Sequence, residues 1–396
     1  MPRDSSTEPT SLSRSLRIAV VSPYKVWPPN NGGRALVAGG CEHMVRAGAS
    51  VRCFALHTLC ERNSRQPPPF DYVERCAGLS AFNALDRLRL SKIPFLTTLK
   101  FYAPRFARWA QAFGADLVEV HMPWLMGIRR WLPGWIPVVY HAQNVEADWY
   151  EPILASRRFP GLWSRQVRRM ENRAVRLADR ILTLTSRDAS ELARRYGVPM
   201  ERITSQPPGI EVPPPPDRAP PARKTGRRRA AFCGSRFSDN VASALRIIRD
   251  IAPACRSDWD FEIAGGVCGE LRREPVPDNV RLLGFVDDLV GWLRGCDVFV
   301  HPVQMQTGIN MKLSSALAAR LPIVATADGA RGFESFLGGA LRVVAAAEFP
   351  KALQNPHRWS ASDEDALQAC AWPRVIEERL AAYRQWIADA RAEPRP

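Results

Sequence analysis

The residues with the clearest chemical potential lie between 295 and 333, in the stretch GCDVFVHPVQMQTGINMKLSSALAARLPIVATADGARGF. The pattern predicts a strand, a glycine-containing loop and a helix that carries Lys312 within its first turns. Free backbone N–H groups at a helix start and a nearby cation both favour an anion, and together they suit a diphosphate. Six lysines stand against 49 arginines, so a lysine here is unusual for the composition. The alternative is an amphipathic helix with one solvated lysine.

Two further places in the first half of the chain hold residues that could act on a ligand. The loop PYKVWPPNNGGRALVAGG follows a predicted strand, and its Gly32 and Gly33 lead into a helix whose N–H groups could meet an anion. His141 ends the strand PVVYH, where an imidazole could hydrogen-bond a sugar hydroxyl or move a proton near neutral pH. His121 ends the preceding strand in the same way. The glycine pair could instead mark a simple turn, and the following helix could satisfy His141.

These residues need elements that bring them together, and the chain alternates β-rich apolar runs with helical patterns. Such alternation is typical of a parallel sheet wrapped by helices. The predicted strands span residues 17–23, 50–56, 116–122, 137–142, 180–186 and 202–207 in the first half, and 230–235, 261–266, 280–285, 298–302, 322–327 and 341–346 in the second. Because ligands bind at the carboxyl ends of such strands, two facing sheets should form a cleft that holds the chemistry.

The predicted fold class is therefore α/β, with two doubly wound, Rossmann-like domains. The predicted segments are a disordered N-terminus over 1–15, an N-terminal acceptor-side domain over 16–211, a Pro- and Arg-rich linker over 212–229, a C-terminal donor-binding domain over 230–372 and a final helix over 373–396. That helix could pack on either domain.

Composition and charge limit the class of protein further. Of the 396 residues, 46% are hydrophobic and 24% are charged, which is typical of a globular protein. A polar N-terminus and the lack of an apolar run of about 20 residues predict a cytoplasmic location. Nine cysteines without a CxxC pair predict reduced thiols and no zinc site. The net charge of +15 favours an anionic partner, but no nucleic-acid-binding motif occurs, so we expect no nucleic acid.

Residues 295–333 resemble the donor-binding region of the family 4 retaining glycosyltransferases, and the other elements follow that family's order over nearly the whole chain. The resemblance implies the GT-B fold, in which two Rossmann-like domains face each other across a cleft. It implies that Lys312 contacts the donor phosphates, that His141 is the active-site histidine and that Arg236 is the basic residue paired with the lysine. It assigns donor-binding roles to Gly32, Gly33, Gly308, Gly329 and Gly332.

The chain departs from that family at two points. The family's Glu-x7-Glu pattern, whose second glutamate holds the donor ribose, falls on Thr307 and Ser315. A serine can hydrogen-bond a hydroxyl but lacks the charge that strengthens such a bond, so donor affinity or donor identity should differ. The asparagine of the family's interdomain turn falls on Pro208, which predicts a stiffer hinge.

The function implied by the resemblance is transfer of a sugar, with retention, from a nucleoside diphosphate sugar to a hydroxyl of a saccharide or lipid-linked acceptor. Lys312, Arg236 and helix N–H groups would stabilise the departing diphosphate, so we expect neither metal nor cofactor. A DxD-like string over residues 258–260 is predicted to be a surface turn. Two alternatives stay open: a catalytically degenerate binding or scaffold protein, which Ser315 motivates, and an epimerase or phosphorylase.

A possible membrane contact is the remaining expectation. Residues 85–135 mix Arg, Lys, Trp and Phe on predicted helices, and residues 156–176 add a second basic stretch. Such a surface could rest on anionic lipid at the inner membrane and reach a lipid-linked acceptor. The alternative is a set of ordinary helices with an apolar core face and solvated arginines.

Overall fold

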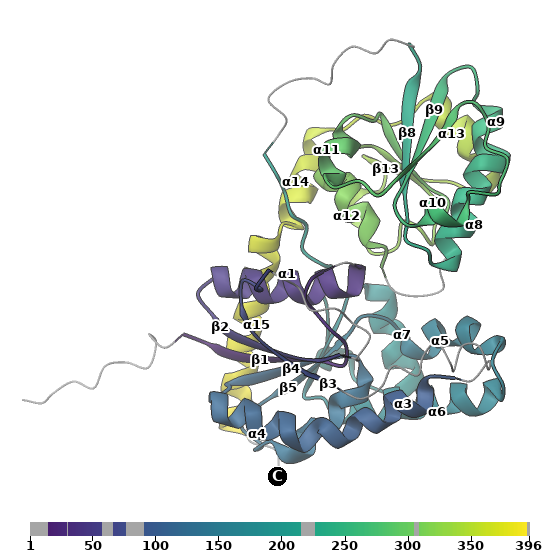
Figure 1. Ribbon diagram of the computed structural model, residues 1–396. Helices are drawn as coiled ribbons and strands as arrows, with labels where there is room; N and C mark the ends of the chain where they lie inside the picture. Colours follow the sequence, from purple (N-terminus) through teal and green to yellow (C-terminus); the bar gives the residue numbers. More distant parts are fainter. Residues whose placement is uncertain are drawn as a thin grey trace, which may run out of the picture.

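The computed structural model describes residues 15–29, 31–57, 66–76, 91–214, 226–304 and 309–393. Each half of the chain contains one parallel β-sheet wrapped by helices, and the two halves form separate lobes (Figure 1). The predicted α/β architecture of two Rossmann-like units is confirmed. The predicted disordered N-terminus lies almost wholly outside the described residues, as does most of the predicted linker.

The sheet of the N-terminal half has the order β3-β2-β1-β4-β5-β6-β7, and all its neighbouring strands are parallel. Its strands are β1 (Arg17–Ser22), β2 (Ser50–His57), β3 (Asp71–Cys76), β4 (Leu117–His121), β5 (Val138–Ala142), β6 (Arg180–Thr183) and β7 (Ile203–Ser205). The central strands are apolar runs because both faces of a parallel sheet are covered. Edge strand β3, with the polar sequence DYVERC, was missed because it lacks this signal.

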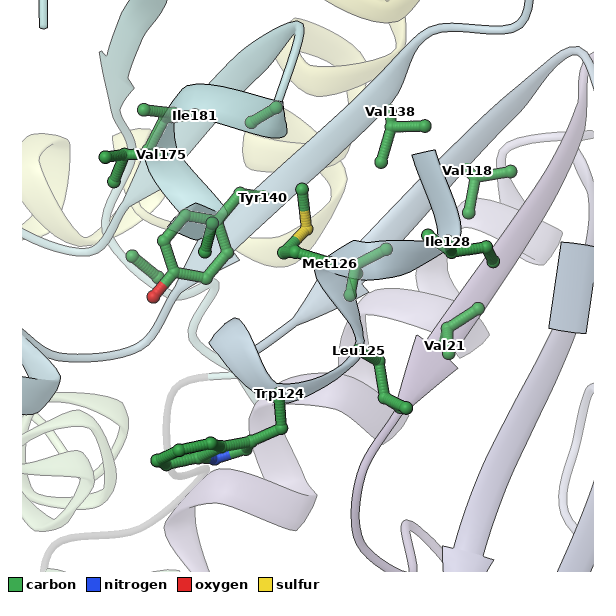
Figure 2. Close-up of a cluster of buried hydrophobic side chains, with 14 of the residues drawn as sticks. Val21, Val118, Trp124, Leu125, Met126, Ile128, Val138, Tyr140, Val175 and Ile181 are labelled. Carbon is green, nitrogen blue, oxygen red and sulfur yellow. The ribbon is translucent and has the colours of Figure 1, made fainter. Parts of the chain in front are cut away.

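Helices cover both faces of this sheet. They are α1 (Gly32–Arg46), α3 (Ile93–Thr98), η1 (Leu99–Tyr102), α4 (Ala103–Phe113), η2 (Pro123–Trp131), α5 (Glu146–Ala155), α6 (Pro160–Leu177), α7 (Ser186–Tyr196) and η3 (Met200–Arg202). Figure 2 shows one face of the sheet, where Met126 of η2 lies beside Tyr140 of β5 and Leu125 of the same helix lies beside Val21 of β1. The core on this face joins the strands to η2, α4 and α6.

The sheet of the C-terminal half has the order β10-β9-β8-β11-β12-β13, again with parallel neighbours. Its strands are β8 (Arg228–Cys233), β9 (Trp259–Ala264), β10 (Val280–Gly284), β11 (Val298–His301), β12 (Ile323–Ala325) and β13 (Leu341–Val343). The helices are α8 (Ser238–Arg246), η4 (Ile247–Ile251), α9 (Ala252–Ala254), α10 (Val267–Glu270), α11 (Leu289–Arg294), α12 (Met311–Ala318), η5 (Glu334–Phe336), η6 (Ala346–Glu348), α13 (Phe349–Gln354) and α14 (Ala361–Ala369). All the strands predicted for this half are present, with ends that differ by a few residues.

The last helix, α15 (Trp372–Ala392), packs on the N-terminal half and so decides between the two positions left open by the sequence. Its apolar side chains, including Ile376, Leu380 and Tyr383, share a buried cluster with α1 and the second face of the N-terminal sheet. Figure 1 shows this helix, in yellow, running beside that sheet. The chain therefore crosses twice between the halves.

The two crossings lie side by side. Ile210 of the first crossing forms a parallel bridge with Ala371 of the second. The Ile210 N–H donates to the Cys370 carbonyl at 2.8 Å, and the Trp372 N–H donates to the Ile210 carbonyl at 3.2 Å. The Trp372 ring also stacks on His43 of α1, with ring centroids 5.3 Å apart. The connection between the halves is thus a paired, packed element.

Candidate functional site

A cavity of about 750 Å³ lies between the two halves, at the carboxyl ends of both sheets. Its lining comes from the loops after β1 and β5 on one side and from those after β8, β9, β10 and β11 on the other. This is the place where ligands bind in doubly wound sheets, and the volume is in the range of small-molecule sites. The cleft predicted from the strand pattern is therefore present.

Lys312 lies in the first turn of α12 and lines this cavity. The Asn310 side-chain oxygen caps the helix by accepting hydrogen bonds from the Lys312 backbone N–H and from its Nζ, each at 3.2 Å. Burial lowers the pKa of Lys312, and the nearby Cys233 and Asp239 offset only part of this effect. A partly desolvated cation at the start of a helix attracts a polyanionic ligand.

The N-terminus of α1 faces the same cavity from the other half. Asn31 caps this helix by accepting a hydrogen bond from the Arg34 N–H at 3.0 Å, and Gly32 and Gly33 form the first turn. A Cβ atom added at Gly32 would lie 3.1 Å from Cγ of Met311, at the start of α12. The structure therefore brings Gly32, Gly33 and Lys312 to one space, as the sequence predicted, with two helix N-termini directed into it.

Two family models match the chain within these two halves. Glycosyltransferase Family 4 matches residues 31–212, and Glycosyl transferases group 1 matches residues 227–355. The chain belongs to glycosyltransferase family 4.

Relatives of this family share sequence and fold with the chain. A Streptomyces avermitilis protein named D-inositol 3-phosphate glycosyltransferase is 28% identical over 257 residues, 55% of this chain and 54% of that protein. The chain thus spans about half the length of this curated relative. Sucrose-phosphate synthase from Thermosynechococcus elongatus matches with a TM-score of 0.69 at 15% identity, covering 94% of this chain and 100% of that chain. Anabaena HepE in complex with UDP matches with a TM-score of 0.60 at 12% identity, covering 93% and 100%. Both structures show that the GT-B fold is shared.

Most residues of the N-terminal wall of this family 4 cleft were not predicted from the sequence. Gln143 and Asn144 follow β5, Trp149 and Tyr150 lie on α5, and all four line the cavity. The Trp149 ring stacks on Phe237 of the opposite half, with centroids 5.5 Å apart and planes at 6°. A signal existed for the first two residues, because chemistry in these folds lies in the loops after the strands. Gln143 and Asn144 occupy such a loop, whereas His141 lies within the strand.

His141 is placed away from the cavity lining. Its side chain is 1% exposed, and Nδ1 donates to Oε1 of Glu119 at 2.7 Å. Its ring stacks on that of His121, with centroids 4.6 Å apart. Burial lowers the pKa of His141 to about 4, helped by His121 and opposed by Glu119. The ring is therefore neutral at physiological pH and lies behind the wall that Gln143 forms.

Arg236 is not among the residues that line the cavity. Its side chain is 74% exposed and lies 3.8 Å from the Glu270 carboxylate, whereas its neighbours Ser235 and Phe237 line the cavity. Among the described residues, Lys312 is the cation that lines the C-terminal wall, and Arg236 packs beside Gly266, which also lines the cavity. A joint role of Arg236 and Lys312 stays a prediction.

The two predicted loop glycines lie beside the cavity rather than in its lining. Gly329 packs against the His301 carbonyl, where a Cβ atom would lie 2.8 Å from the oxygen. Gly332 has a φ of 83° and contacts Ile309 and Thr185, so it lies where the two halves meet. A left-handed backbone at such a contact favours glycine.

The chain departs from the family's Glu-x7-Glu pattern at two positions, and the structure describes only one of them. Ser315 lies on α12, one turn beyond Lys312, and does not line the cavity. Thr307 and Gly308 lie outside the described residues.

A second buried acidic group lies behind the wall formed by α5. The Glu146 side chain is fully buried, and its backbone N–H donates to Glu171 at 2.5 Å. Burial raises the pKa of Glu146 to about 8, with a further contribution from Glu171 and a partial offset by Asn144. Burial also raises the pKa of Glu171 to about 7, although the Tyr196 hydroxyl donates to it. Glu146 is therefore largely protonated at neutral pH.

One group among the described residues has the donor atoms and spacing that could hold a metal ion. It consists of Glu119, His121 and His141, whose ligand atoms lie within 4.8 Å of one another. In the structure Oε1 of Glu119 lies 2.7 Å from His141 Nδ1 and 3.0 Å from His121 Nε2, which are hydrogen-bond distances. The carboxylate is therefore engaged with both rings.

The surface turn predicted for the DxD-like string is confirmed for Asp258, which is exposed in a turn, whereas the other two residues belong to a strand. Trp259 and Asp260 begin β9, with Trp259 buried in the core, and Asp260 pairs with Arg227 at 3.3 Å. The string occupies the amino end of a strand, opposite the end where the cavity lies.

Proposed function

We propose that the chain is a glycosyltransferase that moves a sugar, with retention, from a nucleoside diphosphate sugar to a hydroxyl acceptor. The observation that carries this proposal is the convergence of Lys312 and the N-termini of α1 and α12 on one cavity. In such a reaction negative charge grows on the departing diphosphate. A cation and backbone N–H groups fixed at that place stabilise it more in the transition state than in the ground state.

The two walls suggest which substrate each side binds. On the C-terminal wall, the glycine-containing loops after β8 and β9 let a nucleotide approach the backbone, and Lys312 lines the same cavity. UDP binding by Anabaena HepE, which shares the fold, supports a nucleoside diphosphate there. On the N-terminal wall, Trp149, Tyr150 and Lys92 line the cavity and supply aromatic surface and a cation. Such a surface suits a saccharide or lipid-linked acceptor, including one with an anionic group.

Metal independence is part of the same proposal. The positive charge that the leaving diphosphate requires is supplied by Lys312 and by helix N–H groups. Transfer should therefore persist in EDTA, and a complete loss of activity that Mg²⁺ or Mn²⁺ restores would contradict this point. Retention is tested separately by the anomeric configuration of the product in NMR spectra.

An anionic membrane surface is the further partner that we propose. η1 and α6 both pack against η2, and their exposed apolar side chains include Phe101 at 70%, Phe159 at 63% and Leu162 at 56% exposure. Exposed Arg158 and Arg165 lie among them in the sequence. Apolar side chains interspersed with arginines favour the interface of an anionic bilayer. Within the described residues, none of the helices combines the length and apolar character of a membrane span.

Vesicle sedimentation tests the membrane contact. We expect binding to vesicles that contain phosphatidylglycerol and little binding to pure phosphatidylcholine, with a loss when Phe101→Ser and Phe159→Ser are combined. Met200→Ser, which alters an exposed apolar side chain on η3, is the control. Equal binding by the double variant would contradict the contact.

Calorimetric titration with UDP, GDP and ADP tests the donor site. We expect one nucleotide to bind, and we expect Lys312→Ala to weaken it about tenfold or more, or about 1.4 kcal/mol. Lys351→Ala, which removes an exposed lysine on α13, is the matched control. If folded protein binds no nucleotide, the transferase proposal fails and a catalytically degenerate GT-B binding protein takes its place.

A further inference from the structure

The Gln143 side chain is 8% exposed and forms part of the cavity wall beside the start of α1. Its Nε2 donates to the Tyr24 hydroxyl at 2.7 Å and lies 3.2 Å from Nδ1 of His121. Its Oε1 faces Gly33, where an added Cβ atom would lie 3.3 Å away. Among the described residues, no hydrogen bond occupies this oxygen. A buried amide thus has its donors engaged and its acceptor open toward the ligand space.

A buried carboxylate explains why the amide has this orientation. Glu119 is 1% exposed; burial alone would raise its pKa, but hydrogen bonds from His121 and His141 lower it well below the usual range. An ionised carboxylate only accepts hydrogen bonds, so His121 Nε2, at 3.0 Å, must carry a proton. Nδ1 of the same ring lies 3.2 Å from Nε2 of Gln143, and because an amide NH₂ group only donates, Nδ1 is the acceptor of this hydrogen bond.

The second donor of the amide is fixed by Tyr24. Burial raises the pKa of Tyr24, so it stays a phenol. Its hydroxyl donates to the Gly33 carbonyl at 3.2 Å and accepts the hydrogen bond from Gln143. The hydrogen bonds therefore run in one direction, from Gln143 through Tyr24 to Gly33. Flipping the amide would place Oε1 against the Nδ1 lone pair.

The carboxylate is itself held by the last helix. The Tyr383 hydroxyl of α15 donates to Oε2 of Glu119 at 2.6 Å, and both side chains are buried. A chain of hydrogen bonds thus connects Tyr383 of α15, through Glu119 and His121, to Gln143 in the cavity wall. Supporting hydrogen bonds of this kind, together with packing, hold a side chain in one rotamer.

We propose that Oε1 of Gln143 accepts a hydrogen bond from a hydroxyl of a sugar bound in the cavity, and that Glu119 is the positioning residue that holds this acceptor in place through His121. The inference rests on the proposed function. The oxygen lies beside the α1 N-terminus, across from Lys312, where a sugar attached to a diphosphate or an incoming acceptor sugar would lie. A site that holds a buried acceptor discriminates against a ligand that lacks the matching hydroxyl.

Equilibrium binding measures the contact without requiring turnover. We would compare the Kd of the nucleoside diphosphate with that of its sugar conjugate in the wild type, in Gln143→Leu and in Gln385→Leu, an exposed control on α15. We expect Gln143→Leu to weaken binding of the conjugate about tenfold and binding of the diphosphate less than twofold. If only the Kd of a saccharide acceptor, titrated as the third ligand, rises in Gln143→Leu, the hydroxyl belongs to the acceptor, and the contact stands. Unchanged values for all three ligands would overturn it.

The positioning role needs a readout that a general loss of stability does not move. In ¹⁵N-histidine NMR spectra of the free protein, we expect the His121 ring to carry its proton on Nε2, and we expect Glu119→Gln to abolish this preference. A ring protonated on Nδ1 would overturn the assigned orientation. Because the spectrum needs no substrate, it remains decisive if the wild type binds no nucleotide, the outcome that removes the proposed function and the hydroxyl contact.

A double-mutant cycle then links the two residues. Glu119→Gln should reduce the gain in affinity that the sugar provides, and adding it to Gln143→Leu should cause no further reduction. Additive losses would show that Glu119 acts only on overall stability. Should Glu119→Gln fail to fold, Tyr383→Phe replaces it, because it removes one hydrogen bond to the carboxylate and leaves both histidine contacts.

Discussion

The two walls of the cleft are built in different ways. The C-terminal wall consists of strand-to-helix loops rich in glycine, with one enclosed cation, Lys312, and a backbone that supplies most of the polar groups. The N-terminal wall rests on buried side chains that bond one another, from Tyr383 through Glu119 and His121 to Gln143. The difference is clear for the histidines: His121 is hydrogen-bonded, whereas both ring nitrogens of His301 lack a partner among the described residues.

This contrast indicates two ways of preparing a site for a ligand. A wall of backbone N–H groups needs little side-chain support, because secondary structure already fixes their direction. A wall of side-chain amides and hydroxyls must be fixed by further residues, because each group could otherwise rotate or flip. Substitutions of the supporting residues behind the N-terminal wall should therefore mainly lower stability, whereas substitutions on the C-terminal wall should mainly lower ligand affinity.

The largest expected effect is on the N-terminal wall. Glu119→Ala should lower the free energy of unfolding by about 3–5 kcal/mol, because it leaves two histidines and a tyrosine without their shared partner. Urea unfolding measures this change. Glu262→Ala is the comparison in the other sheet, where a buried carboxylate accepts one hydrogen bond, from Trp292. A similar loss in both variants would remove the contrast between the walls.

The buried Glu146 should make stability depend on pH. Its pKa is raised from an ordinary 4.5 to about 8, so the folded protein holds more protons than the unfolded chain between these values. The contribution of Glu146 to the free energy of unfolding is therefore greatest below about pH 4.5 and is lost as the pH rises toward 8. Each unit of difference between the folded and unfolded pKa corresponds to about 1.4 kcal/mol. Glu146→Gln should flatten the curve of unfolding free energy against pH. Glu151→Gln, on the exposed face of α5, should leave it unchanged.

Lys312 should favour nucleotide binding at a cost in stability, whereas Glu119 should favour stability. Because burial lowers its pKa, the folded state disfavours its charge, and stability should rise as pH rises toward the ordinary pKa of lysine. Lys312→Met should therefore raise the melting temperature of the free protein while weakening nucleotide binding about tenfold. Thermal scans with and without nucleotide measure both. A fall in melting temperature of the free protein would contradict this reasoning.

The smallest expected effect concerns the contact between the walls. Phe237→Ala removes the ring that stacks on Trp149 and should cost about 0.5–1.5 kcal/mol of the interaction between the halves. The overall unfolding free energy should change little, but small-angle scattering should show a more open molecule. Phe101→Ala removes an exposed ring remote from the cleft and is the control. An unchanged scattering profile for Phe237→Ala would show that the stack does not hold the halves together.

The C-terminal wall could be predicted from the sequence because its signals are local. A buried strand, a glycine loop and a helix carrying Lys312 follow one another within about forty residues. The same holds for Gly32 and Gly33 after β1. The central strands could also be predicted, because strands that are buried on both faces have nearly continuous apolar runs.

The N-terminal wall could not be predicted because its parts are distant in sequence. Tyr24, Glu119 and Gln143 meet because β1, β4 and β5 are neighbours in the sheet, and Tyr383 joins them only because α15 returns to that sheet. The hydrophobic periodicity of the sequence does not predict this return. His141 was chosen for its chemistry, but the strand turns it inward, toward Glu119. Arg236 was placed by order along the chain, which does not show that its guanidinium lies beside Glu270.

The return of α15 also bears on how parts of this protein could be exchanged with those of relatives. The helix is joined to the C-terminal half, yet its Tyr383 completes the hydrogen bonding of Glu119 in the N-terminal half. A chimaera made with a single junction near residue 212 would combine an N-terminal sheet from one parent with the supporting helix of the other. Junctions at both crossings, near Ile210 and Ala371, would keep each module with its own helix. Recombination within this architecture is therefore expected to succeed as an insertion of the C-terminal half rather than as a simple exchange of chain ends.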